Sequence, residues 1–213
     1  MIVNGRLAPG SWIIESDLAT LLRLSRTPTR AALQWLQHEG YVIERGMGTK
    51  SRVMVAPLTL SDARELYAIV GSIEGIAGRN TAALPAAQRK SVVAALKELN
   101  AKMVTISKSA TPDPVAFADT DTAFHDEIVR SSAGPRLLTI YNGIKPQTDR
   151  YWNLYSRLIT DDMKTSCAEH AAIIGAINDG DCKATERALE INWSNGAERL
   201  GKAILKFGER GSW

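Results

Sequence analysis

The strongest constraint on this chain is a helical repeat of apolar residues that runs from Leu60 almost to its end. Helix-breaking stretches interrupt the repeat at Pro85, at SATPDP, at SSAGP and at NDGD. Each predicted helix carries an apolar stripe that has to be buried against another helix, so we expect an all-α antiparallel bundle. The spacing predicts helices over about 61–82, 86–108, 113–132, 135–156, 161–178 and 182–207.

The first quarter of the chain has shorter and more varied elements. ESDLATLLRL and TPTRAALQWLQHEG carry apolar residues at helical spacing, and the second helix is expected to end at Gly40. YVIER and SRVMV flank RGMGTK and predict a β-hairpin. The order helix, turn, helix, hairpin is typical of a winged helix-turn-helix. We therefore expect a mainly α protein with a winged helix-turn-helix over 1–56 and an all-helical domain over 60–213, joined near Pro57.

Charge distribution points to a polyanionic partner for the first domain. Residues 1–56 hold seven Lys and Arg against four Asp and Glu, which accounts for the whole net charge of +3. The sequence has no apolar run of about 18 residues and no signal peptide, so we expect no membrane span and a cytoplasmic location. Two cysteines, Cys167 and Cys182, are too few for a disulfide framework and are expected to be reduced.

The stretch SRTPTRAAL, residues 25–33, opens the second helix with cations and hydroxyls. A helix N-terminus attracts phosphate, and two arginines four residues apart share a face from which they reach base edges. No acidic residue lies nearby in the sequence to pair with them, so we expect them to await an anion of another molecule. The alternative is a set of solvated charges around an ordinary helix cap. The residues expected at DNA are Ser25, Arg26, Thr27, Thr29 and Arg30, with Gly48 and Lys50 in the hairpin tip.

The run from Asn4 to Val53 resembles the winged helix-turn-helix of GntR-family transcriptional regulators. The pieces that match are NGRLAPG, LATLLRLSRTPTRAALQWLQHEGYV and ERGMGTKSRV, and SRTPTRAAL follows the family's SRTPVREAL pattern. The resemblance implies that Arg26, Thr27 and Arg30 contact DNA and that Gly48 is the wing glycine. In that family a helix precedes NGRLAPG, whereas this chain starts almost at that segment. The resemblance therefore implies a missing packing partner for Leu18, Leu21, Leu33 and Leu36.

Polar side chains occupy inward positions on three predicted helices of the second domain. Asp121 and His125 are four residues apart, and His170 shares the apolar stripe of its helix. Asn192 lies beside another apolar stripe. Such ligands suit Zn, Ni, Mn or Fe. An inward histidine is more often a hydrogen-bonded core residue, so spacing alone leaves both interpretations open.

Residues 60–210 resemble the all-helical FCD effector domain of the FadR subfamily of GntR regulators. The pieces that match are SDARELYAIVGSIEGIAGRNTA, DTDTAFHDEIVRSSAGPRLL and CAEHAAIIGAINDGDCKATERALEINW. In that family an Asp and three His often bind a divalent metal at the floor of an effector pocket. Three of these ligands match Asp121, His125 and His170, and Asn192 takes the place of the fourth. An arginine that is frequent in the first helix of the domain is replaced by Val70, so Arg150, with Tyr151 beside it, is the candidate contact to a carboxylate effector.

These resemblances imply a homodimeric repressor rather than an enzyme. Its binding to double-stranded operator DNA would be controlled by a small organic acid beside a divalent metal, with Zn, Ni or Mn as candidates. One alternative is a metal-responsive regulator, in which the metal itself is the signal. A remoter alternative is a metal-dependent hydrolase or lyase. Against it, no separate general base or nucleophile stands out near the proposed ligands, and the basic N-terminal domain would have no role.

Overall fold

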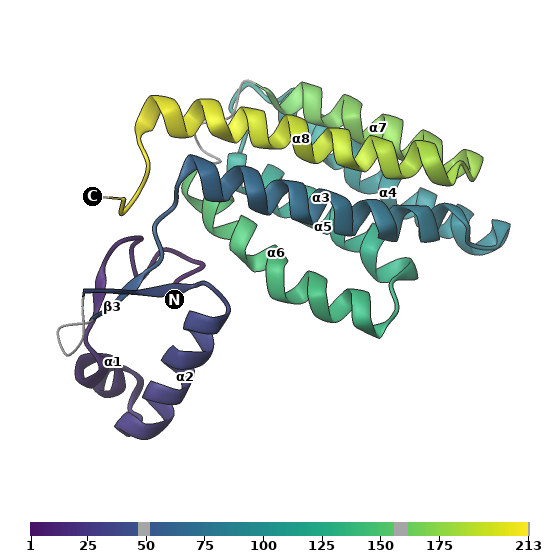
Figure 1. Cartoon of the computed structure of the whole chain (residues 1–213). Helices are drawn as coiled ribbons and strands as arrows, with labels where there is room; N and C mark the ends of the chain where they lie inside the picture. The colour runs from purple at the N-terminus through teal and green to yellow at the C-terminus, as the bar shows by residue number, and fades with distance from the viewer. Residues whose placement is uncertain (47–51, 156–161, 213) are drawn as a thin grey trace.

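A computed structural model describes residues 1–46, 52–155 and 162–212 of the chain. Within these residues there are eight helices and three strands, and Figure 1 shows a small domain beside one end of a longer helical bundle. The small domain contains β1 (Trp12–Ile13), α1 (Glu15–Leu22), α2 (Arg26–His38), β2 (Val42–Arg45) and β3 (Arg52–Val55). The bundle contains α3 (Leu60–Ala82), α4 (Ala86–Ser107), α5 (Pro114–Ser132), α6 (Pro135–Tyr155), α7 (Met163–Asp179) and α8 (Cys182–Phe207).

The small domain is a winged helix, as the sequence predicted. Its sheet is antiparallel in the order β1-β3-β2, with Val42 opposite Val55 and Trp12 opposite Met54. The turn between the two helices is made at Arg23, which ends α1 in the left-handed region at φ 55°. Strand β1 was not predicted, because two residues are too short to show an alternation of apolar and polar side chains.

The apolar face of the winged domain is covered only in part. Of the four leucines expected to lack a partner, Leu33 is buried, Leu18 and Leu36 are half-buried, and Leu21 is 63% exposed. Met1 and other apolar residues of the first turn line a cavity of about 360 Å³ against α1 and α2. A surface of this kind stabilises the domain less than a closed core would.

The bundle is built on the close pairing of α3 with α8, which Figure 1 shows side by side. Glycine at position 78 permits this approach, because a Cβ atom there would lie 2.3 Å from Cδ1 of Leu189. An apolar core that includes Phe124, Ile173 and Leu189 joins α4, α5, α7 and α8. The six helices follow the predicted ranges closely, since each breaker in the sequence falls between two of them.

Two further expectations can be compared with the described residues. None of their helices has the length and hydropathy that crossing a membrane requires. Cys167 and Cys182 are free thiols, and Cys167 is buried beside Met163 and Phe117.

Candidate DNA-binding and metal-binding sites

The N-terminus of α2 presents an open, basic surface. Ser25 precedes the helix in an extended conformation, and its side chain makes no capping hydrogen bond. Arg26 and Thr27 are exposed, and the first turn of the helix contains no acidic residue. The unpaired N–H groups and partial positive charge of such a helix start favour phosphate binding.

Two residues expected at DNA are placed differently. Thr29 is buried, and its hydroxyl donates to the carbonyl oxygen of Ser25 at 2.9 Å, so its side chain supports the helix and does not face the solvent. Arg30 is exposed but not free: its Nε and Nη2 atoms donate to the two carboxylate oxygens of Glu15 on α1, each at 2.9 Å. The expectation that no acid lies near Arg30 was wrong, because Glu15 is distant in sequence. Gly48 and Lys50 lie outside the described residues.

Three predicted metal ligands meet inside the bundle. Asp121 and His125 lie on α5 and His170 on α7, and one ligand atom from each falls within 4.8 Å of the other two. Nε2 of His170 is 3.5 Å from Oδ1 of Asp121. Two ligands about 2.1 Å from one tetrahedral zinc ion would be about 3.4 Å apart, so this pair already has suitable spacing.

His170 provides the test of whether these residues fit a metal. Its side chain is fully buried and stacks on Phe124, with the ring centroids 4.0 Å apart. Neither ring nitrogen has a hydrogen-bond partner among the described residues, and the contact to Asp121 is too long for a strong hydrogen bond. A buried polar atom without a partner is costly. The hydrogen-bonded core histidine that was the alternative is therefore disfavoured, and the cluster fits a divalent cation.

The pKa shifts of the three side chains also show that burial disfavours their charged forms. Burial raises the pKa of Asp121, and burial with His125 and Arg199 nearby lowers the pKa of His170 well below its usual value. Burial also lowers the pKa of His125, but the charge and hydrogen bond of Glu74 outweigh this effect and raise it. Metal ligands must be deprotonated, and a divalent cation would stabilise both an ionised carboxylate and a neutral imidazole.

Asn192, predicted as the fourth ligand, lines the same cavity as Asp121 and His125. Its amide nitrogen donates to Glu169 at 2.8 Å, which leaves the carbonyl oxygen as the atom for a metal or a ligand. Glu169 is held in turn by Arg199, with two contacts of 2.9 and 3.1 Å.

The cavity beside this cluster has a volume of about 60 Å³. Lys145 and Arg199 line it, and they pair with Asp149 (2.6 Å) and Glu169 respectively. Trp152 and Tyr67 contribute apolar wall. Space of this size holds a metal ion with a few waters, whereas a cavity that accommodates benzene is about 150 Å³.

The predicted effector contacts Arg150 and Tyr151 lie elsewhere, because they occupy the opposite side of α6. Arg150 is buried, donates to the carbonyl oxygen of Ala56 at 2.6 Å, and lies 5.9 Å above the ring of Tyr41. The hydroxyl of Tyr151 donates to Asp62 at 2.5 Å. Both side chains therefore hold the connection between the domains and do not line the cavity.

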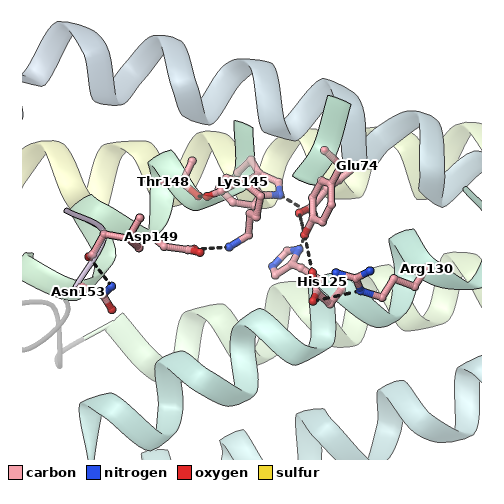
Figure 2. A network of polar contacts seen from close by, with 11 residues as sticks. Glu74, His125, Arg130, Lys145, Thr148, Asp149 and Asn153 are labelled. Atoms are coloured by element: carbon pink, nitrogen blue, oxygen red, sulfur yellow. Dashed lines mark hydrogen bonds and ion pairs between the residues drawn. The ribbon is translucent and has the colours of Figure 1, made fainter. Parts of the chain in front are cut away.

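Sequence reasoning assigned no role to Glu74, which is fully buried on α3. Figure 2 shows its carboxylate against His125, with Oε2 2.5 Å from Nδ1. A signal was present: the positions three and four residues away on either side are Val70, Gly71, Ala77 and Gly78. One acid among such neighbours on a buried helix face indicates a specific partner.

The winged helix exposes the basic N-terminus of α2, and it is joined to an all-helical domain that contains a polar cavity. These features define a class of DNA-binding proteins with a separate second domain. Comparison with known proteins gives the family. Residues 1–50 match the gntR family of bacterial regulatory proteins, and residues 65–192 match the FCD domain. The chain belongs to the GntR family of transcriptional regulators and carries an FCD domain, so it is a regulator and not an enzyme.

Individual relatives agree with this assignment. The chain is 29% identical over 192 residues to a probable D-xylose utilization operon transcriptional repressor of Paenarthrobacter nicotinovorans, covering 88% of this chain and 78% of that protein. It is 26% identical over 198 residues to the gluconate operon transcriptional repressor of Bacillus licheniformis, covering 91% and 78%. The solved structure of E. coli McbR/YncC has the same fold, with a TM-score of 0.69 at 18% identity over 94% of this chain and 92% of that one.

Proposed function

We propose that the chain is a cytoplasmic, homodimeric repressor whose binding to operator DNA is controlled by a metal and a small carboxylate in the bundle cavity. Two winged domains related by a two-fold axis would read two half-sites. Arg26, Thr27 and the N-terminus of α2 would contact the DNA. The relatives named as repressors support repression over activation.

The observation that carries this proposal is the double role of α6. Lys145, Thr148, Asp149 and Trp152 line the cavity, and their spacing places them on one helix face. On the other side, Gln147 donates to the carbonyl oxygen of Glu39 at the C-terminal end of α2. Arg150 and Asn153 donate to carbonyl oxygens of Ala56 (2.6 Å) and Val3 (3.0 Å).

The size of the cavity gives the coupling a physical cause. Zn²⁺ would be held by Asp121, His125 and His170, with Asn192 as a fourth donor, and would supply a positive charge at the cavity floor. A carboxylate of more than a few atoms exceeds about 60 Å³, so we expect its binding to displace the wall. Since α6 forms part of that wall and also holds the winged domain, the DNA-reading surface would move with it. Couplings of this kind change affinity by about 5- to 150-fold.

The small cavity also favours the alternative, a metal-responsive regulator, because an ion fits without any opening. The test is fluorescence anisotropy with a duplex from the gene's upstream region against a scrambled duplex, over a salt series. We expect tighter binding to the native duplex, with affinity falling steeply as salt rises. Zn²⁺ alone and Zn²⁺ with a panel of small carboxylates separate the two candidates. If neither addition changes the affinity of a protein that binds its duplex, control through the cavity is wrong.

A further inference from the structure

We propose that Glu74 is a positioning residue of the metal site. Its carboxylate holds His125 in the tautomer that carries the proton on Nδ1, so that Nε2 is presented to the ion. This inference rests on the proposed metal site, and it adds a residue that no ligand pattern in the sequence contains. Glu74 does not touch the metal; it acts through His125.

The geometry fixes the direction of the hydrogen bond. Oε2 of Glu74 lies 2.5 Å from Nδ1 of His125, and the indole Nε1–H of Trp193 donates to the same oxygen at 2.7 Å. An indole only donates, so Oε2 accepts from Trp193, and as an oxygen of a carboxylate, which only accepts, it also accepts from Nδ1 of His125. Nε2 is then the nitrogen whose lone pair is available to a metal ion shared with Asp121 and His170.

The charge of Glu74 is the second argument. Its side chain is fully buried, and its partners within the described residues are His125, Trp193 and Tyr141, whose hydroxyl donates to Oε1 at 3.3 Å. No Lys or Arg is among these partners, so the imidazole of His125 is the one partner among them that can neutralise the negative charge of the carboxylate. A buried charge without compensation is costly. A cation bound to the far side of the imidazole supplies that compensation, and the carboxylate raises the basicity of the ligand in return.

The chain offers a matched pair of variants. Glu74→Gln keeps the shape and the acceptor: its carbonyl oxygen can accept from His125 and Trp193, while its NH₂ can donate to the hydroxyl of Tyr141. It removes the negative charge and turns one acceptor atom into a donor, so His125 keeps only a weaker, neutral acceptor. Asp126→Asn is the control, because Asp126 accepts from the same Tyr141 at 3.0 Å, carries the same charge and is 33% exposed. Within the described residues its carboxylate makes no hydrogen bond or ion pair with His125.

The experiment is a competition titration of the full chain with Zn²⁺ against a chromogenic chelator, for the unaltered protein and both variants. Glu74→Gln is expected to lose about 10- to 100-fold in Zn²⁺ affinity, which is the usual effect of mutating a partner that hydrogen-bonds a metal ligand. Asp126→Asn is expected to stay close to the unaltered protein. In ¹H–¹⁵N spectra of the zinc-loaded protein, the Nδ1 proton of His125 should be strongly downfield and protected, and Glu74→Gln should shift it upfield.

Each other outcome overturns the inference in a distinguishable way. Equal Zn²⁺ affinity in Glu74→Gln, with or without a lower melting temperature, means that Glu74 is only structural. Equal losses in both variants mean that net charge matters and position does not. If the unaltered chain binds no Zn²⁺, Ni²⁺ or Mn²⁺, the metal site fails and the role of Glu74 fails with it.

Discussion

Replacing His170 by leucine should reverse the order of thermal stability when metal is added. The imidazole is buried, and neither of its nitrogens has a partner in the described part of the chain; such groups cost about 1–3 kcal/mol when left unsatisfied. Leucine removes that cost but also the ring stack on Phe124, which is worth about 0.5–1.5 kcal/mol. The metal-free variant should therefore be more stable than the unaltered protein by about 1 kcal/mol, which is about 2–4 °C in melting temperature for a chain of this length.

Metal has the opposite effect. An ion present at about 100 times its dissociation constant stabilises the folded protein by about 2.7 kcal/mol. For this chain length that corresponds to about 5–11 °C. The unaltered protein should gain this increase, and His170→Leu should lose most of it, so the unaltered protein melts higher only when metal is present.

The assay is differential scanning calorimetry of chelator-treated protein, with and without Zn²⁺, Ni²⁺ or Mn²⁺. His38→Leu is the matched control, because it removes a histidine that is 85% exposed and lies on α2 of the winged domain, whereas the cluster lies on α5 and α7 of the bundle. It should keep the full metal response. The reasoning is refuted if metal-free His170→Leu melts well below the unaltered protein, or if no metal raises the melting temperature of the unaltered protein.

Three further predictions concern the winged domain and its attachment. Arg26→Ala should weaken operator binding by about 1–3 kcal/mol in anisotropy titrations if the side chain reads a base. Arg30→Ala should weaken it less, because the Arg30 guanidinium is already paired with Glu15; equal losses would show that this ion pair breaks on DNA. In urea unfolding, Leu33→Ala should cost about 2–5 kcal/mol and Leu21→Ala less than about 0.5 kcal/mol; similar costs would mean that the apolar face is covered in solution. Arg150→Met should leave Zn²⁺ affinity intact but reduce the effect of cavity ligands on DNA affinity, and an unchanged effect would remove this contact from the coupling route.

The helices and the class of fold could be read from the sequence because their signals are local. Breakers such as Pro85 and a 3.6-residue repeat depend only on neighbouring residues, and GntR-like motifs identified the family. The errors arose where distant residues meet. Arg30 meets Glu15 only after α1 and α2 pack, and Thr29 is buried because it lies one turn from Leu33 on the inner face of α2.

The same limit applies to the candidate site. Asp121, His125 and His170 could be named from the resemblance, and spacing alone did not distinguish them from core residues. Which face of α6 points into the cavity could not be predicted, because neither face is simply exposed to solvent. One face lines the cavity, and the other contacts the connection to the winged domain. Glu74 was missed because the partner that explains it is on another helix.

The most direct test of the central claim is equilibrium dialysis of the metal-free chain against Zn²⁺, Ni²⁺ and Mn²⁺, with bound metal measured by elemental analysis. The chain should retain one ion per molecule of at least one of these metals, and Asp121→Ala and His125→Ala should each lower the retained amount sharply. Retention of no metal above the level of a histidine-free control protein, or undiminished retention by both variants, would contradict the metal site on which the proposed control of DNA binding depends.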